Sequence, residues 1–283
     1  MKLIHITDTH FVKAGEILYG LDTQARLDAC IADINLHHPD AELCVITGDL
    51  AHRGEAKAYA HLRASLAWLQ VPWRLLIGNH DDRTQLLAAF PETPSDEYGF
   101  IQSTLDTPAG RLMFLDTVFT GIHAGGYCER RLVWLENQLE AARDLPVYLF
   151  LHHPPFAVGL KSLDAFGIHD GALGQLIASY PNVRHLFFGH VHRPIAGTWK
   201  GIGFSTLRAT SHQFWLDFTT EELPISHEPP AYAVVLIEGD RLIVHFHDYL
   251  YEHPLIDLSG TVYAKQQRLR KTEPMCELQE ING

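Results

Sequence analysis

The chain has 283 residues, of which 46% are apolar and 20% are charged, and its formal net charge at pH 7 is −12. This composition is typical of a soluble globular protein with a sizeable core, in one large domain or two small ones. The acidic balance argues against a nucleic acid polymer as partner, because that needs a basic patch. No run approaches the roughly 18 apolar residues of a membrane span, so we expect no membrane partner either.

The first ten residues and the cysteines indicate a reducing compartment. The opening MKLIHITDTH has neither a long apolar core nor a small-residue cleavage site, so we expect no signal peptide. The four cysteines are scattered along the chain without the paired spacing of a metal site. These features predict a cytoplasmic protein.

Short apolar runs alternate with amphipathic stretches in the first two-thirds of the chain. The first helix is expected from Asp22 or Thr23 to about Leu36. Strand followed by helix, repeated, is typical of an α/β fold. The predicted strands are 3–7, 43–47, 74–77, 112–116, 147–151 and 185–188, and the other predicted helices are 55–69, 129–142 and 172–180.

The pattern changes after about residue 200. Two β-rich segments, 231–237 and 241–247, are joined by a turn that contains Gly239-Asp240, which predicts a hairpin. The irregular stretch 214–230 is a loop or a cap element. We therefore expect a core over 1–200, C-terminal strands that complete it together with a cap or association element over 201–260, and a tail over 261–283.

Polar side chains follow five of the predicted strands. In open α/β sheets, ligands bind beyond the carboxyl ends of the strands, so we expect these side chains to converge. Alone, each motif has an ordinary structural explanation, such as a turn, a helix cap or a hydrogen-bonded core histidine. All five in order make coincidence improbable. The motifs are Asp8-Thr9-His10, Gly48-Asp49, Gly78-Asn79-His80-Asp81, His152-His153 and Gly189-His190-Val191-His192.

The side chains in these motifs are carboxylates, imidazoles and one amide. This set suits Mn, Fe, Zn or Co and has too much nitrogen for Ca²⁺. In an extended segment residues i and i+2 point the same way, so both polar residues of D-x-H and of H-x-H are expected to reach inward. The candidates exceed the need of one ion, and two ions sharing a carboxylate would each receive four ligands. The candidates are Asp8, His10, Asp49, Asn79, His152, His190 and His192.

The order D-x-H, G-D, G-N-H-[DE], H, G-H-x-H resembles the calcineurin-like metallophosphoesterase superfamily over Asp8 to His192. The spacing is most similar to the class III cyclic-nucleotide phosphodiesterases and the bacterial glycerophosphodiesterases, and residues 15–20 (GEILYG) resemble the latter branch. The resemblance implies a four-layer αββα sandwich of two mixed sheets flanked by helices, with a C-terminal β-rich cap or association region. It also implies a homo-oligomer.

The resemblance also implies a role for each candidate residue. Asp49 bridges two metal ions, and His80 is no ligand but faces the phosphoryl group as a catalytic residue. His212, in the stretch Ser211-His212-Gln213, is expected to contact substrate, and His153 to act there or behind a ligand. The first ion is held by Asp8, His10, Asp49 and His192, and the second by Asp49, Asn79, His152 and His190.

The predicted reaction is hydrolysis of small phosphodiesters, 3′,5′-cyclic nucleotides or glycerophosphodiesters, by a metal-bridging hydroxide. His80 would protonate the leaving group. Two divalent ions and the carboxylates of Asp8 and Asp49 leave about +2 at the site, which suits an anionic substrate despite the acidic chain.

Three alternatives remain open. They are a phosphomonoesterase, a nucleotide pyrophosphatase, and a metal-dependent scaffold without turnover. Protein Ser/Thr phosphatases of the superfamily carry G-D-x-x-D-R-G, and here His52 stands in place of the second aspartate, so that interpretation is disfavoured. His52 lines the site or lies on a surface loop. His5 and His185 are expected to face away from the site, and His123 has no assigned role.

Overall fold

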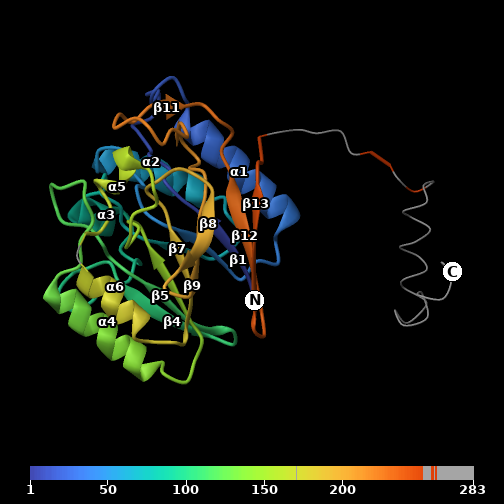
Figure 1. Cartoon of the computed structure of the whole chain (residues 1–283). Coiled ribbons are helices and arrows are strands. Elements are labelled where there is room, and N and C mark those ends of the chain that lie inside the picture. The colour runs from blue at the N-terminus through green and yellow to red at the C-terminus, as the bar shows by residue number, and fades with distance from the viewer. Residues whose placement is uncertain (170, 251–255, 258, 260–283) are drawn as a thin grey trace. The chain divides into compact units, whose positions relative to one another are not determined.

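Two β-sheets pack face to face among residues 1–250 (Figure 1). The structure, a computed structural model, describes residues 1–169, 171–250, 256, 257 and 259. In the first sheet β1, β2 and β3 are parallel, and β12 is antiparallel to β1 and β13. Its order is β13 (Arg241–His247), β12 (Tyr232–Glu238), β1 (Lys2–Ile6), β2 (Leu43–Ile46) and β3 (Trp73–Leu75).

The second sheet has six strands. Its central strands β5, β6, β7 and β9 are parallel, and the edge strands β4 and β8 are antiparallel to their neighbours. Both large sheets are therefore mixed. The order is β4 (Ser103–Thr107), β5 (Gly110–Phe114), β6 (Val147–Leu151), β7 (Val183–Phe188), β9 (Ile202–Thr206) and β8 (Ile195–Trp199).

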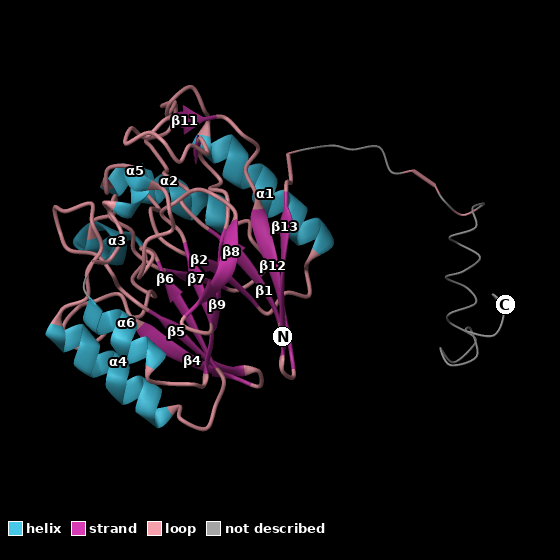
Figure 2. Ribbon diagram, viewed as in Figure 1, coloured by secondary structure: helices cyan, strands magenta, loops and turns pink. Residues whose placement is uncertain are grey.

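Helices cover the outer face of each sheet (Figure 2). Side chains of α1, α2 and α3 pack on the first sheet, and those of α4, α5 and α6 pack on the second. The first helix starts as expected, because the Asp22 side chain accepts a hydrogen bond from the Ala25 amide. The helices are α1 (Thr23–His37), α2 (Ala56–Leu66), α3 (Arg83–Ala89), α4 (Glu129–Ala141), α5 (Lys161–Asp164) and α6 (Gly171–Ala178).

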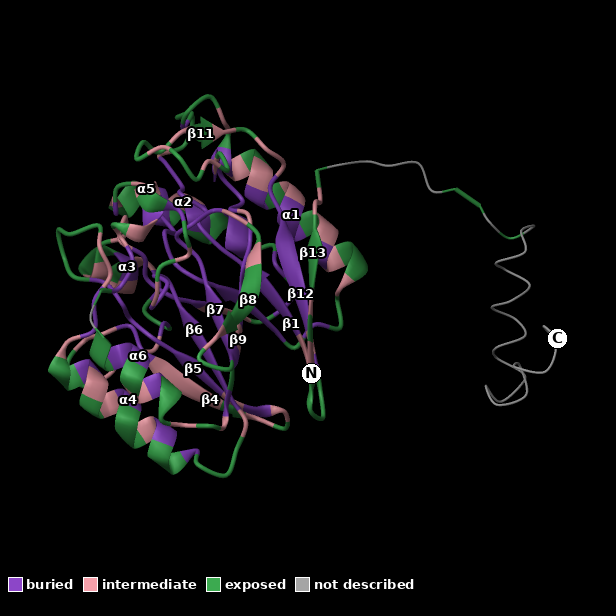
Figure 3. Cartoon of the chain, viewed as in Figure 1, coloured by how far each residue is buried: buried purple, intermediate pink, exposed green. Residues whose placement is uncertain are grey.

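Side-chain alternation along the central strands builds three apolar layers. In β6, Tyr148 and Phe150 point between the sheets, while Leu149 and Leu151 point toward the helices. Such strands are buried on both faces and coloured accordingly in Figure 3. This explains their unbroken apolar sequence. The predicted four-layer αββα sandwich is confirmed.

The C-terminal strands are also as expected, since β12 and β13 extend the first sheet. The 214–230 stretch is more ordered than a loop, because β10 (Gln213–Phe214) and β11 (Ile225–Ser226) pair as a small antiparallel ladder. Residues 1–250 form one compact unit, and a second unit spans 251–283. The domain boundaries stay predictions, and the predicted tail lies outside the described residues. Within the described part of the chain, no helix is long and apolar enough to cross a membrane.

Two histidines lie buried between the sheets. The His5 ring meets Phe150 and Phe187 edge-on, with ring centroids 6.2 and 5.7 Å away. His185 Nε2 lies 2.9 Å from Ser205 Oγ. Burial lowers the pKa of His5 to about 3 and that of His185 to about 4. Both rings are therefore neutral near pH 7.

We expect the free energy of unfolding to fall as the pH is lowered from about 6.5 to 4. Histidines in the unfolded chain take up protons near pH 6.5, whereas His185 resists protonation until about pH 4, so stability is complete above 6.5 and is lost below it. His185→Leu should remove up to about 3 kcal/mol of this pH dependence. Urea unfolding of wild type and variant at several pH values measures it, and equal slopes would contradict the prediction.

Candidate metal centre

The carboxyl ends of strands from both sheets meet at one edge of the sandwich. The structure brings all of the predicted metal ligands to this edge, as the strand-end argument requires. The first sheet supplies Asp8 and His10 after β1, Asp49 after β2 and Asn79 after β3, and the second sheet supplies His152 after β6 and His190 and His192 after β7.

One group consists of Asp8, His10, Asp49 and His192. All four are buried, and one ligand atom from each lies within 4.8 Å of the others. His192 Nε2 is 3.2 Å from Asp8 Oδ1 and 3.2 Å from His10 Nε2. His10 Nε2 is 3.5 Å from Asp49 Oδ2. Two imidazole nitrogens and two carboxylate oxygens therefore face a common point.

A second group lies on the other side of Asp49. His152 Nε2 is 3.4 Å from Asp49 Oδ1 and 3.1 Å from Asn79 Oδ1. His190 Nδ1 is also 3.1 Å from Asn79 Oδ1. Asp49 thus presents Oδ2 to the first group and Oδ1 to the second, which is the arrangement that a bridging carboxylate needs.

The protonation state of the histidines bears on metal binding, because a ligating imidazole must be neutral. Burial lowers the pKa of His10 and His190 well below the usual value. Burial also lowers the pKa of His152, but the Asp49 carboxylate outweighs it and raises that pKa to about 9. A metal ion in the second group therefore competes with the proton on His152. The nitrogen and oxygen donors fit a pair of transition-metal ions.

Main-chain carbonyls orient two of the rings. The ring N–H at His152 Nδ1 donates to the Thr47 carbonyl at 2.7 Å, and the one at His192 Nδ1 donates to the His212 carbonyl at 2.7 Å. Each bond fixes the tautomer that leaves Nε2 free as a ligand.

The predicted backbone conformation of two motifs was wrong, although their residues do converge. We expected an extended backbone through D-x-H and H-x-H, but β1 ends at Ile6 and β7 at Phe188. The polar residues that follow are in the left-handed region, which is costly for residues other than glycine and typical of functional sites. Their φ angles are 53° at Asp8, 43° at His10, 48° at Asp49, 69° at His190 and 47° at His192.

Glycines make room for this packing. Gly48 has a φ of +93°, which favours glycine. A Cβ on Gly78 would lie 2.2 Å from Asp49 Oδ1, and one on Gly189 would lie 2.9 Å from Asp8 Oδ2. Backbone and ligand therefore approach each other closely at both positions.

Asp81 organises the motif loops, a role that the sequence did not suggest. Its carboxylate accepts hydrogen bonds from the amides of Gly78, Leu50 and Ala51, at 2.9 to 3.0 Å. The Tyr59 hydroxyl adds a fourth bond at 2.9 Å. One side chain thus ties the loop after β2 to the loop after β3. Its signal in the sequence is the last position of G-N-H-D.

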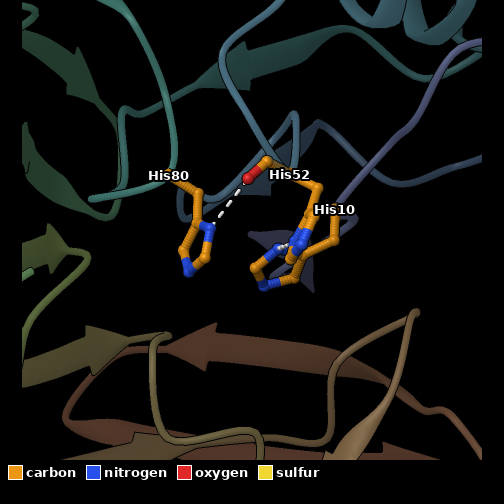
Figure 4. A group of neighbouring side chains, drawn as sticks. All are labelled: His10, His52 and His80. Carbon is orange, nitrogen blue, oxygen red and sulfur yellow. Dashed lines mark hydrogen bonds between the residues drawn. The ribbon is translucent and has the colours of Figure 1, made fainter. Parts of the chain in front are cut away.

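His80 lies beside His10 and His52 (Figure 4). The ring N–H at Nδ1 donates to the His52 carbonyl at 2.8 Å, and the backbone N–H donates to Asp49 Oδ1 at 2.9 Å. The ring stacks on His52 and meets His10 edge-on, with centroids 5.0 and 4.8 Å away. His52 Nδ1 also lies 3.3 Å from His10 Nδ1. His52 therefore belongs to the site.

A cavity of about 270 Å³ opens onto the metal centre. Five of the predicted ligands line it, together with four further histidines, namely His10, Asp49, Asn79, His190 and His192 with His52, His80, His123 and His212. Its wall is apolar, and among the described residues that line it Asp49 is the only acidic group and there is no lysine or arginine. The apolar wall consists of Tyr19, Leu163, Phe166, Phe214, Leu223 and Ile225.

The two other predicted substrate residues differ in position. His212 lines the cavity, with its ring 4.7 Å from that of His192. His153 is fully buried, and Nδ1 and Nε2 lie 2.8 Å from Thr117 Oγ1 and 3.1 Å from the His123 carbonyl. Contact of His153 with substrate stays a prediction, while its hydrogen bonds suit a residue that supports the His123 loop.

His123, which had no assigned role, lies at the mouth of the cavity. The Asn79 amide donates from Nδ2 to His123 Nδ1 at 3.0 Å, which turns Asn79 Oδ1 toward His152 and His190. The loop around His123 has no strand or helix pattern, so only the tertiary structure reveals this contact.

These motifs define a known class. Residues 1–194 match the family described as calcineurin-like phosphoesterase, and the chain belongs to this family. A probable cyclic nucleotide phosphodiesterase of Rhodopseudomonas palustris is 43% identical over 93% of this chain and 97% of that protein. The glycerophosphodiester phosphodiesterase GpdQ of Enterobacter lignolyticus is 32% identical over 75% of this chain and 78% of that protein.

Two further comparisons concern sequence and fold. The 3′,5′-cyclic adenosine monophosphate phosphodiesterase CpdA of Escherichia coli K12 is 30% identical over 76% of this chain and 78% of that protein. The crystal structure of a dimetal phosphatase from Danio rerio superposes with a TM-score of 0.67 at 16% identity, over 88% of this chain and 96% of that one. The structural likeness supports the fold assignment.

Proposed function

We propose that this chain is a metal-dependent phosphodiesterase that hydrolyses small phosphodiesters, namely 3′,5′-cyclic nucleotides, glycerophosphodiesters or both. The observation that carries the proposal is Asp49, whose two carboxylate oxygens face two separate groups of ligands. Relatives named for cyclic nucleotides and for glycerophosphodiesters, at 43% and 32% identity, support the same reaction class.

The ligand assignment follows the two groups. Asp8, His10, Asp49 and His192 would hold one ion, and Asp49, Asn79, His152 and His190 the other. Bound there, two metal ions supply an activated water as nucleophile and stabilise charge on the phosphoryl oxygens. The donor set suits Mn, Fe, Zn or Co.

His80 is the proposed general acid. Because its Nδ1–H is held by the His52 carbonyl, Nε2 is the atom left to give a proton to the leaving alkoxide. His212 lines the cavity with its ring 5.1 Å from that of His10, which supports it as a substrate contact.

The apolar wall supports a flat or apolar leaving group, such as the nucleoside part of a cyclic nucleotide. Phe166 and Phe214 offer aromatic faces, and no carboxylate besides Asp49 is present among the described lining residues to attract a cationic head group. Glycerophosphodiesters remain the second candidate because of the relatives that carry this name.

Turnover of four compounds by the Mn²⁺-loaded protein tests this proposal. We expect cyclic AMP and bis-p-nitrophenyl phosphate to be hydrolysed faster than p-nitrophenyl phosphate, with glycerophosphoethanolamine as the competing natural substrate. Monoester turnover that greatly exceeds diester turnover contradicts the proposal in favour of a phosphomonoesterase. No hydrolysis by a metal-loaded protein contradicts it in favour of a scaffold.

The chain is also proposed to self-associate and to act in the cytoplasm. Large apolar side chains are exposed in the loop before α1 and in the loop after β10. Among them are Ile17, Trp215 and Phe218, which are 59%, 58% and 60% exposed. Exposed apolar groups of this size are typical of protein–protein contacts. The scattered cysteines support a reducing compartment.

A further inference from the structure

A buried chain of hydrogen bonds leads from the space between the sheets to a predicted metal ligand. His5 Nε2 lies 2.9 Å from Thr47 Oγ1, Thr47 Oγ1 lies 2.8 Å from Thr7 Oγ1, and Thr7 Oγ1 lies 2.5 Å from Asp8 Oδ2. All four residues are at most 1% exposed. These hydrogen bonds run from His5 in β1 to Thr47 after β2, and then back to Thr7 and Asp8 after β1.

The direction of each bond follows from the Asp8 carboxylate, which only accepts. Thr7 must donate its hydroxyl proton to Asp8 Oδ2, so Thr7 accepts from Thr47. Thr47 then accepts from the N–H at His5 Nε2. Every donor points toward the carboxylate, and bonds aligned in this way polarise and strengthen one another in a buried environment.

The hydrogen-bond chain holds one oxygen of Asp8 more firmly than the other. Oδ2 receives the Thr7 hydroxyl and, at 3.0 Å, the His190 amide, which also lies 3.3 Å from Oδ1. Oδ1 faces His192 Nε2 at 3.2 Å. Gly189 encloses the arrangement, because a Cβ there would lie 2.1 Å from Thr7 Oγ1. Oδ2 thus receives the shorter hydrogen bonds from the protein, and Oδ1 is directed to the metal position.

We propose that His5 is a positioning residue of the metal centre, which orients Asp8 through Thr47 and Thr7 and so tightens metal binding in the group that contains Asp8. This inference rests on the proposed function of the site. Hydrogen bonds behind a ligand commonly change metal affinity by about 10- to 100-fold when they are lost. His5 is the member of the hydrogen-bond chain farthest from the metal position, so its loss is expected to lower metal affinity by about tenfold.

His185 provides a matched control. It is also a buried histidine between the sheets, and it also bonds to a hydroxyl, that of Ser205. Its ring lies 4.4 Å from that of Phe187, which also contacts His5. No hydrogen bond among the described residues links Ser205 Oγ to the metal ligands. A purely structural role for His5 therefore predicts the same effect for His185→Leu as for His5→Leu.

The test measures Mn²⁺ binding by electron paramagnetic resonance and equilibrium dialysis on metal-depleted full-length protein. The variants are His5→Leu, His5→Gln, Thr47→Val, the double variant His5→Leu/Thr47→Val, and His185→Leu. Glutamine can donate from a position close to histidine Nε2, so His5→Gln should restore affinity. The Thr47→Val change leaves the carbonyl that holds His152 in place. Circular dichroism checks that each variant folds.

We expect His5→Leu and Thr47→Val each to lower the affinity for one of the two Mn²⁺ ions by at least about tenfold. The double variant should bind that ion no more weakly than Thr47→Val does. Three results would overturn the role of His5 while leaving the proposed function intact. They are wild-type Mn²⁺ affinity in His5→Leu, equal losses of affinity in His5→Leu and His185→Leu, or additive losses of affinity in the double variant. If His5→Leu does not fold, Thr47→Val and His5→Gln decide. Wild type that binds no Mn²⁺ overturns both this inference and the proposed function.

Discussion

Replacing Asp49 by alanine is expected to remove bound metal and turnover together. Its two oxygens lie 3.5 and 3.4 Å from nitrogens of the two groups, so neither group keeps its full donor set without it. Loss of metal-ion stabilisation of the transition state costs several kcal/mol, which corresponds to about a thousandfold or more in kcat. Elemental analysis of the purified variant and kcat with bis-p-nitrophenyl phosphate measure both effects.

Two controls sharpen this experiment. Asp49→Asn keeps an acceptor for the His80 backbone N–H, so loss of metal in this variant assigns the effect to the charge. Asp40→Ala removes a surface carboxylate that pairs with Lys2, and it should leave metal content unchanged. A full complement of metal in Asp49→Ala, with kcat near wild type, would show that Asp49 does not bridge.

His80→Ala should retain metal and lose turnover by about 10²- to 10⁴-fold. The ring of His80 belongs to neither ligand group in the proposed assignment, and its bond to Asp49 comes from the backbone, which the substitution preserves. A general acid matters most for a poor leaving group. The loss should therefore be larger for cyclic AMP, whose leaving group is an alkoxide, than for bis-p-nitrophenyl phosphate.

The metal content of this variant is decisive, because ring nitrogens of His10, His52 and His80 also lie within 4.8 Å of one another. A metal ion held by these three would make His80 a ligand. Elemental analysis that finds metal lost from His80→Ala would refute the assigned role. Equal losses of kcat for both substrates would refute general-acid catalysis while leaving the metal assignment intact.

The buried parts of the fold are predictable from the sequence, because their apolar runs are long and sharply ended. β6 is found at its predicted bounds, Val147–Leu151, and α4 covers Glu129–Ala141 against a predicted 129–142. The sheet edges are less predictable. β8 (Ile195–Trp199) is mostly exposed, and α3 (Arg83–Ala89) is short and buries only Leu86, so neither carries a clear apolar pattern.

The site shows a similar division. Each predicted ligand follows a strand that the sequence locates, so the assembly of the seven could be foreseen. The left-handed backbone at Asp8 and His10 could not, because the cost of that conformation is met by tertiary contacts. The contact between His123 and Asn79 likewise depends on loop packing. Asp81 becomes recognisable only when its four donors come together around it.

The placement of the ligands has a mechanical consequence. Asp8, His10, Asp49 and Asn79 extend from one sheet, and His152, His190 and His192 extend from the other. An ion held by His10 and His192 therefore joins residues 182 positions apart in the chain. Such an ion acts as a clip that closes a very long loop, and clips of this kind restrict the unfolded chain most strongly. The cofactor would thus fasten the two halves of the sandwich at the edge where the substrate enters.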